Sequence, residues 1–475
     1  MNPPLRKLSV VVLIMFVTLM VALTYIQFFR APSLNADGRN VRTLYAQYGT
    51  DRGNLVVGGE AITSSEPVDD AYKFQRMYAN GPLYAPLTGY FSVAFNSMTE
   101  LERSQNGILS GSDSSLFTQR LQQLITGAQP KGGSVSLTID PVIQQAAADA
   151  LAGQKGAIVA LEPSTGKILA LVTTPTYDPN TLATHDATAA QQAWEELNAD
   201  PDKPLMNRAT SGDLYPPGSS FKIVTVAAME EEGITSDSVI EAPTTYTLPG
   251  TATDVTNFVG ECGDGSGQTS LRTALVLSCN TPFAIAGVEM GAQKLMDKAA
   301  EFGFGQELDL GIDYTPSLFP EPSDDAALAM DAFGQRDIQT TPLQMAMVAA
   351  AVANHGTLMK PYLVDQTLSA DLSVISTTAP EEFSQPMSRA IADDITSMMK
   401  DVVADRYVGA RVPGVDVAGK TGTAENAEAP HAWFIGFDAG ENPKIALAVF
   451  VENGGLGGDV AGPLAAQVIQ AAVNR

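Results

Sequence analysis

The sequence predicts an α+β protein whose main domain is a five-stranded, mainly antiparallel sheet with helices on both faces. Two observations predict this class. GAIVALEPSTGKILALVTT reads as two β-rich arms around a turn at 163–166, and three further strand patterns, VDVAGKTGTAE, HAWFIGFDA and KIALAVFVEN, lie near the C-terminus. The stretch between these two groups is rich in helical pattern, so one sheet would collect strands from both ends of the domain.

The first predicted element is a membrane-spanning helix over residues 8–29. This run carries no charge, and at about 1.5 Å rise per residue it matches a hydrocarbon core of roughly 30 Å. Arg6 and Lys7 precede it, which predicts a cytoplasmic tail over residues 1–7 and an extracytoplasmic body. We favour a single-pass anchor in the cell membrane over a cleaved signal peptide, because the apolar run is long and no A-x-A-like site follows it.

Two domains are expected after the anchor. Residues 30–135 are polar and turn-rich, with short strand patterns such as GNLVVGG (53–59), and are predicted to form a smaller, β-rich N-terminal domain. QPKGGS (129–134) marks the boundary, and residues 136–475 form the main domain. Strong periodicity begins at the strand pattern SVSLTID and continues into a helix capped by Asp140, started by Pro141 and closed by Gly153. A last helix is expected near 461–474.

Composition excludes some classes of function. The chain has 475 residues and a formal net charge of −25, and because nucleic-acid binding needs clustered Lys and Arg, no nucleic-acid partner is expected. His185, His355 and His431 are interpreted as ordinary polar residues, and neither a metal nor a cofactor is expected. The two cysteines, Cys262 and Cys279, can pair in an oxidising extracytoplasmic space, and we favour this disulfide over two buried thiols.

Three short patterns occur in order along the main domain: S-x-x-K at 219–222, S-x-N at 278–280 and K-T-G at 420–422. Each is common by itself, since S-x-x-K also occurs at 164–167 and S-x-N at 33–35 and 104–106. The copy at 164–167 lies in a predicted hairpin turn, where no helix can hold its two side chains together. The other two copies lie before the domain boundary. Local context therefore selects the patterns that begin at 219, 278 and 420.

Ser219 and Lys222 lie in PPGSSFK, at the start of a helical pattern that ends at Gly233. A spacing of three residues on a helix places the two side chains together. One interpretation is a serine helix cap followed by a solvated lysine; the other is a serine nucleophile with a lysine base. A lysine accepts a proton only when it is neutral, and burial together with a second cation, such as Lys420, would lower its pKa.

Ser278 and Asn280 are expected in a tight turn between two helices, with Thr281 as the cap and Pro282 as the first residue of the second helix. If this turn projects into a cleft, Ser278 can relay a proton between Lys222 and a leaving amine. The Asn280 amide can contact both Lys222 and a substrate carbonyl. Taken alone, a plain helix-stop signal explains the pattern equally well.

The K-T-G-T segment at 420–423 lies within a strand pattern, where glycine is unusual unless another backbone approaches closely. A peptide substrate added as a strand would be such a backbone. Lys420 would attract its terminal carboxylate, which the hydroxyls of Thr421 and Thr423 would hydrogen-bond. Gly422 would leave room for it. The backbone N–H groups of Ser219 and Thr423 are the expected oxyanion hole.

Together the motifs resemble those of active-site-serine β-lactamases and penicillin-binding proteins, and the chain is most similar to class B penicillin-binding proteins. PPGSSFK, SCN and KTGTAE match that family's three motifs at their expected places. IVALEPSTGKILALV resembles the first hairpin of the transpeptidase fold, FGQRDIQTTPLQMA (333–346) the start of a helix, and NVRTLYAQYGTDRG (40–53) the start of the N-terminal pedestal. Among subgroups, the chain resembles the actinobacterial penicillin-binding protein A group, which acts in septal wall synthesis.

The resemblance implies a D,D-transpeptidase that cross-links peptidoglycan stem peptides ending in D-Ala-D-Ala. Ser219 would attack the penultimate D-Ala carbonyl, D-Ala would leave, and an amine of a neighbouring stem would resolve the acyl-enzyme. β-Lactam antibiotics would acylate the same serine. The region before the boundary has no room for a glycosyltransferase domain, so the resemblance also implies a polytopic glycosyltransferase and cell-division (divisome) proteins as partners.

Two other functions stay open. In a D,D-carboxypeptidase or a β-lactamase-like hydrolase, water would resolve the acyl-enzyme, and the three motifs do not distinguish water from an amine. The anchor and the N-terminal domain favour the transpeptidase. In a non-catalytic β-lactam sensor or wall scaffold, several spans or a lost motif residue would be expected, and no motif residue is missing.

Two smaller expectations concern the surroundings of the motifs. Cys279 lies inside the second motif, so a bond to Cys262 would hold the turn that aims Ser278 and Asn280. Trp433 and the NGGLGG loop (453–458) are interpreted as a core aromatic residue and a flexible turn, rather than as borders of the cleft.

Overall fold

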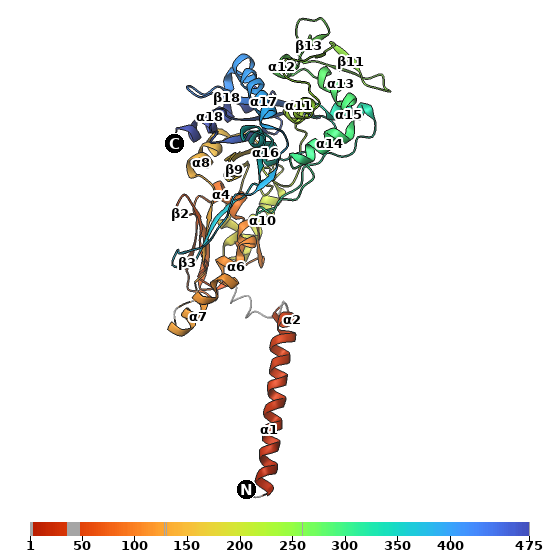
Figure 1. Cartoon of the computed structure of the whole chain (residues 1–475). Helices are drawn as coiled ribbons and strands as arrows, with labels where there is room; N and C mark the ends of the chain where they lie inside the picture. The colour runs from red at the N-terminus through yellow and green to blue at the C-terminus, as the bar shows by residue number, and fades with distance from the viewer. Residues whose placement is uncertain (1–2, 36–47, 128, 130, 259, 475) are drawn as a thin grey trace.

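The computed structural model describes residues 3–35, 48–127, 129, 131–258 and 260–474. Residues 36–47, which include most of the NVRTLYAQYGTDRG stretch, and the first two residues of the predicted cytoplasmic tail lie outside the described residues. A long N-terminal helix stands at one end of the molecule, a pedestal domain lies in the middle, and the main domain forms the other end (Figure 1).

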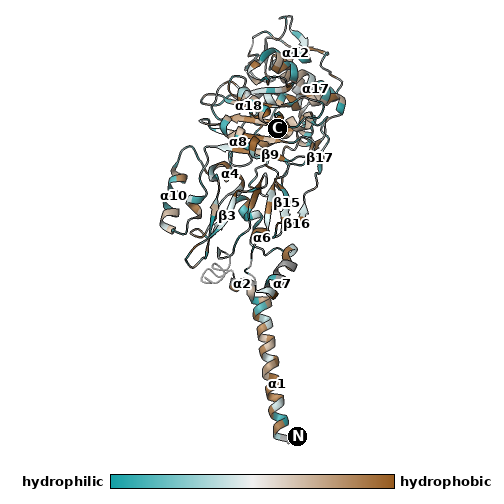
Figure 2. Ribbon diagram, turned by 90° about the vertical axis from the view of Figure 1, so that its left-hand side faces the viewer, coloured by the Kyte–Doolittle hydropathy of each residue, from teal (hydrophilic) through white to brown (hydrophobic). Residues whose placement is uncertain are grey.

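The N-terminal helix α1 (Pro3–Thr24) continues through a π-helical turn, η1 (Tyr25–Arg30), into α2 (Ala31–Asn35). Residues 4–30 have a mean hydropathy of 2.6 in their most apolar part and are long and apolar enough to cross a membrane. No other part of the described protein covers that part of the helix (Figure 2). The predicted span at 8–29 falls inside this helix.

The pedestal is organised around a five-stranded sheet in the order β16–β15–β7–β1–β2. Its strands are β1 (Leu55–Val57), β2 (Glu60–Ala61), β7 (Ser134–Leu137), β15 (Val364–Leu368) and β16 (Val374–Thr377). β7 pairs in parallel with β1 and antiparallel with β15. The predicted boundary at 135/136 therefore falls inside a pedestal strand, and residues 364–377 return to the pedestal from the main domain. The residue ranges given for the two domains stay a prediction.

The rest of the pedestal consists of short elements. They are β3 (Thr63–Pro67), β4 (Phe74–Tyr78), α4 (Gly81–Thr88), β5 (Phe91–Ser92), β6 (Ser97–Met98), α5 (Glu100–Ser104), α6 (Asn106–Leu109), η2 (Ser114–Leu116) and α7 (Phe117–Thr126). A buried ion cluster holds several of them together. Glu102 lies between two arginines, 2.5 Å from Arg52 Nε and 2.6 Å from Arg76 Nε.

The main domain contains the predicted five-stranded sheet, and every neighbouring pair in it is antiparallel. The order is β18–β19–β20–β8–β9, with β8 (Gly156–Leu161), β9 (Ile168–Thr174), β18 (Val417–Ala424), β19 (His431–Asp438) and β20 (Ala446–Val451). These are the five predicted strand patterns, so the predicted sheet is confirmed. β18, which carries the K-T-G motif, lies at one edge.

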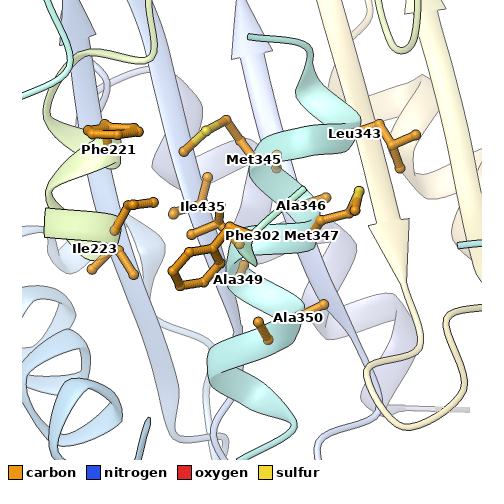
Figure 3. Close-up of a cluster of buried hydrophobic side chains, with 14 of the residues drawn as sticks. Phe221, Ile223, Phe302, Leu343, Met345, Ala346, Met347, Ala349, Ala350 and Ile435 are labelled. Carbon is orange, nitrogen blue, oxygen red and sulfur yellow. The ribbon is translucent and has the colours of Figure 1, made fainter. Parts of the chain in front are cut away.

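Helices cover both faces of this sheet, as predicted. α8 (Pro141–Ala150) and α18 (Ala461–Val473) pack on one face, and Asp140 caps α8 by accepting hydrogen bonds from the N–H groups of Val142 and Ile143. α16 (Pro342–Ala353), all of whose residues are buried, packs on the other face. Figure 3 shows α16 surrounded by apolar side chains, among them Phe221, Ile223 and Ile435.

The helix-rich block between β9 and β18 carries the remaining elements. They are α9 (Asn180–Ala183), α10 (Ala187–Ala199), η3 (Gly218–Phe221), α11 (Lys222–Glu231), β10 (Val239–Glu241), β11 (Thr245–Thr247), β12 (Asp254–Thr256), β13 (Gln268–Ser270), α12 (Leu271–Val276), α13 (Thr281–Met290), α14 (Ala292–Glu301), α15 (Asp325–Asp331), β14 (Leu358–Met359), β17 (Glu382–Ser384), α17 (Arg389–Asp401), η4 (Val402–Arg406) and η5 (Val408–Ala410).

Candidate active site

Ser219 lies in the 3₁₀ turn η3, which leads directly into α11, and Lys222 is the first residue of that helix. The sequence predicts a single helix through both residues, and the tighter turn is the one difference. The turn is anchored on both sides. The buried ring of Phe221 packs edge-on against Phe304, and the Ser220 hydroxyl donates to Pro217 O at 2.6 Å.

Two glycines allow η3 to pack directly against the edge strand β18. Gly218 has φ +56°, in the left-handed region that side chains disfavour, and a Cβ there would lie 2.7 Å from Thr423 O. A Cβ on Gly422 would lie 2.6 Å from Pro217 O. The backbone that approaches Gly422 is thus the Pro217–Ser220 turn. The turn therefore accounts for a glycine at this position, and a substrate strand beside Gly422 stays a prediction.

The second motif forms the turn between α12 and α13. Ser278 has φ +56°, and Asn280 is the cap residue of α13, one position before the predicted cap. The side chain of Asn257 fixes this turn, because its Oδ1 accepts hydrogen bonds from the N–H groups of Asn280 (2.8 Å) and Thr281 (3.0 Å). The Asn280 amide in turn donates to Thr256 O at 3.0 Å.

Cys262 and Cys279 form a disulfide, with their Cα atoms 6.0 Å apart. The bond joins the segment between β12 and β13 to the turn that carries Ser278 and Asn280. The structure therefore contains the favoured pairing, and the second motif is held by a covalent bond in addition to the hydrogen bonds of Asn257.

The three motifs meet around the amino group of Lys222. Its Nζ lies 3.0 Å from Ser219 Oγ, 2.9 Å from Ser278 O, 2.9 Å from Asn280 Oδ1 and 3.5 Å from Ser278 Oγ. Lys420 approaches from β18, and its Nζ donates to Ser278 Oγ at 2.8 Å and to Thr421 O at 2.9 Å. Side chains that lie far apart in the sequence thus form one connected cluster.

Both lysines of this cluster are fully buried, and in the described part of the chain neither forms an ion pair. Burial, and secondly the charge of Lys420, lower the pKa of Lys222 well below its ordinary value. Burial, and secondly Arg406, lower the pKa of Lys420 to about 7. The expectation that burial and Lys420 together favour a neutral Lys222 agrees with this electrostatic environment.

A cavity of about 340 Å³ opens beside the cluster. It is lined by Ser219, Phe258, Leu277, Ser278, Asn280, Gln335, Arg406, Tyr407, Thr421, Thr423, Glu425, Leu456, Gly458 and Asp459. Lys420 is absent from this lining, because its amino group is turned into the hydrogen bonds with Ser278 and Thr421. Arg406 is the cation that reaches the cavity wall.

Comparison with known proteins matches residues 156–470 to the penicillin binding protein transpeptidase domain and residues 52–135 to the penicillin binding protein A dimerisation domain. The chain belongs to the class B penicillin-binding proteins. Two relatives are peptidoglycan D,D-transpeptidases PbpA, 42% identical in Mycolicibacterium smegmatis and 43% identical in Mycobacterium tuberculosis, each matched over 100% of this chain and 99% of the relative.

Solved structures of a relative resemble this penicillin-binding protein closely. The ceftriaxone acyl-enzyme complex of penicillin-binding protein A from M. tuberculosis matches with a TM-score of 0.87 and 42% identity, over 90% of this chain and 100% of that one. The imipenem acyl-enzyme complex matches with the same TM-score and identity. The transpeptidase fold with a pedestal domain is thereby confirmed for this penicillin-binding protein.

Several residues of the cavity were not predicted. Leu456 and Gly458 line it, so the interpretation of the NGGLGG loop as a mere flexible turn is wrong, whereas Trp433 is a fully buried aromatic residue packed on Phe450, as expected. Gln335 donates to Thr423 O at 3.2 Å. It lies in the FGQRDIQ stretch, which the sequence relates to the family without indicating a role for this residue. Arg406 lies in a segment with no recognisable pattern.

The histidines of this penicillin-binding protein lie away from the cluster. His185 contacts Asp70, His355 contacts Asp393, and His431 contacts Asn426. None lines the cavity. In the part of the chain that the structure describes, no group of three or more His, Cys, Asp and Glu residues could hold a metal ion.

Proposed function

We propose that this penicillin-binding protein is a D,D-transpeptidase with Ser219 as its nucleophile and Lys222 as the base. The hydrogen-bond geometry at Lys222 Nζ carries this proposal. A neutral amine has two N–H donors and one lone pair. Ser278 O and Asn280 Oδ1, both 2.9 Å away, are carbonyl oxygens that can only accept, so they take the two N–H groups. The lone pair is left for the Ser219 hydroxyl at 3.0 Å.

In the proposed reaction, Ser219 Oγ attacks the penultimate D-Ala carbonyl and its proton passes to Lys222. The N–H groups of Ser219 and Thr423 stabilise the oxyanion. Ser278 Oγ lies between the two lysines, 3.5 Å from Lys222 and 2.8 Å from Lys420, so it can carry the proton on to the departing D-Ala amine. An amine of a second stem peptide then attacks the ester and releases Ser219.

The terminal carboxylate of the substrate needs a cation at the cavity wall. Arg406 is available, because it forms no ion pair among the described residues, and its Nε donates only to the Tyr407 hydroxyl at 3.2 Å. Thr423 Oγ1 accepts from Gly457 N at 3.3 Å, which leaves its own hydrogen free to donate to a carboxylate. We assign binding of the carboxylate to Arg406, Thr421 and Thr423. Lys420 does not contact the carboxylate in this assignment and acts through its hydrogen bond to Ser278 Oγ.

The test is intact-mass analysis of the full chain after treatment with benzylpenicillin, followed by peptide mapping. The relative from M. tuberculosis forms acyl-enzymes with ceftriaxone and imipenem, so one penicilloyl adduct on Ser219 is expected. Ser219→Ala should carry none, whereas Ser220→Ala keeps the nucleophile and controls for disturbance of the turn. An adduct on any residue other than Ser219 would overturn the assignment, and no adduct at all would favour the sensor or scaffold.

The remaining alternative is a hydrolase, in which water releases the acyl group. The lifetime of the acyl-enzyme with a fluorescent penicillin separates the two functions. A transpeptidase that lacks its acceptor should hold the label for many minutes, and rapid release would favour a D,D-carboxypeptidase or a β-lactamase.

The cellular setting is part of the same proposal. The apolar run at 8–29 and the positive charges of Arg6 and Lys7 before it support a single-pass anchor with the body outside the membrane. The resemblance to the penicillin-binding protein A group supports a septal role beside a polytopic glycosyltransferase and divisome proteins. A fluorescent fusion that fails to gather at the division site, or a C-terminal reporter that is active only in the cytoplasm, would contradict these assignments.

A further inference from the structure

Helix α7 presents an apolar face that nothing in the described protein covers. Phe117, Leu121 and Ile125 recur every fourth residue, which places them on one face of the helix. Their exposed fractions are 63%, 47% and 78%. Leu116, directly before the helix, is buried and attaches the start of the helix to the hydrophobic core. Three large apolar side chains exposed in a row mark an interaction surface rather than isolated surface residues.

The position of α7 indicates what covers this face. Both views of the molecule place α7 at the anchor end of the pedestal, level with α2, where the apolar helix ends (Figures 1 and 2). The backbone contacts agree, because Asp51 pairs with Lys131, and Gly132 N donates to Asp51 O at 2.9 Å. The chain arriving from the anchor thus enters the pedestal beside the segment that directly follows α7.

The segment around α7 carries no acidic residue. Acidic residues number 53 in 475, yet none occurs from residue 114 to residue 139, a stretch that contains Arg120 and Lys131. Anionic lipid headgroups repel carboxylates and attract basic side chains. The helix that lies level with the end of the anchor therefore belongs to a stretch that has basic residues and no acidic ones.

We propose that α7 is a second membrane contact, lying in the outer interface of the bilayer that the anchor spans. Phe117, Leu121 and Ile125 would enter the boundary between headgroups and acyl chains, as amphipathic interfacial helices do. This inference rests on the proposed anchor. A second membrane contact would orient the pedestal relative to the bilayer, because attachment at two points limits its tilt. The cavity beside Ser219 would then lie at a fixed height above the membrane, where it meets the wall.

Site-specific photocrosslinking in the full chain tests the contact. The full chain with Leu121→p-benzoylphenylalanine is inserted through its anchor into vesicles of phosphatidylglycerol and, in a separate sample, into vesicles of phosphatidylcholine. Val142→p-benzoylphenylalanine is the matched control, because Val142 is 56% exposed, also on a helix, but belongs to α8 in the main domain. We expect a lipid adduct at position 121 at least fivefold above that at 142, and more of it with the anionic lipid.

Each other outcome overturns the proposal in a recognisable way. Chains that float with the vesicles but give equal adducts at 121 and 142 would leave the anchor intact and refute the contact. Adducts between two chains would make the face a dimer interface instead. Chains that do not float would refute the anchor and the contact together, while penicillin labelling of Ser219 would still report separately on the proposed reaction.

A pair of polar substitutions gives an independent readout. Leu121→Gln combined with Ile125→Gln should leave both the melting temperature and penicillin acylation unchanged, because both side chains already face away from the protein. In vesicles, however, the substitutions should raise deuterium uptake over residues 117–126 relative to the unchanged chain. Equal uptake in the two proteins would contradict the proposal.

Discussion

The pedestal and the candidate active site each bury two cations, but they treat them in opposite ways. In the pedestal, Glu102 lies between Arg52 and Arg76. Burial raises the pKa of Glu102, yet the charges of the two arginines outweigh that effect and lower it overall. In the site, Lys222 and Lys420 are equally buried but have no carboxylate beside them among the described residues, and the pKa of each lysine is lowered.

The charged groups of the pedestal stabilise the fold, whereas the lysines of the site are in an environment that favours proton transfer. A buried ion pair keeps both partners charged, whereas a buried lysine without a counterion gives up its proton more easily and becomes a base. Active sites commonly keep such unfavourable arrangements at the expense of stability. Substitutions should therefore affect stability in the pedestal and reactivity in the site.

The largest effect is expected from Lys222→Met, which keeps the approximate length of the side chain and removes the amine. Penicillin acylation should fall by about 10³-fold, within the range of general-base contributions. The free energy of unfolding should not fall, because a desolvated amine is replaced by an apolar side chain. Stopped-flow acylation and denaturant unfolding measure the two quantities. A large loss of stability would show that the lysine supports the fold rather than the chemistry.

Glu102→Gln should produce the converse result. The substitution leaves two buried guanidinium groups without a countercharge, which typically costs about 3–5 kcal/mol. Acylation per folded molecule should stay unchanged, because Glu102 lies in the pedestal. Urea unfolding monitored beside active-site titration checks this, and Glu100→Gln in the same helix serves as a control, since that carboxylate has no buried arginine partner. Equal losses of unfolding free energy in Glu102→Gln and Glu100→Gln would show that the buried ion cluster does not stabilise the pedestal as proposed.

The contrast also explains which features the sequence could predict. The five strands of the main sheet and the three motifs are each encoded by residues that are close in the sequence. Apolar runs and short spacings are therefore sufficient to predict them. The low pKa of Lys222 could be expected because burial and a second cation act in a known direction. By comparison, β15 is half-buried at every position, so its pattern gives no sign that it returns to the pedestal. Arg406 and Asn257 reach the site only through tertiary packing, which no local pattern records.

The coupling between the two lysines should be visible in the pH dependence of acylation. Lys222 must be neutral to accept a proton, so the rate falls as the pH drops through its pKa. The charge of Lys420, present mainly below about pH 7, lowers that pKa. Lys420→Gln should therefore raise the pKa of Lys222 and move the acid limb to higher pH, whereas Lys420→Arg should leave it in place. If the acid limb of the pH profile stays in place in Lys420→Gln, the charge of Lys420 does not influence the pKa of Lys222.

The smallest effect concerns Arg406, a third cation that forms no ion pair among the described residues. It differs from the two lysines in being only partly buried and in facing the cavity. If it receives the substrate carboxylate, Arg406→Gln should slow benzylpenicillin acylation by about tenfold, the lower end for a charged hydrogen bond. It should barely change acylation by the methyl ester of the same penicillin, which has no carboxylate charge. Arg406→Lys should recover part of the loss with benzylpenicillin. Equal slowing with acid and ester would instead assign Arg406 to holding Tyr407, because only a direct contact with the carboxylate distinguishes the two substrates.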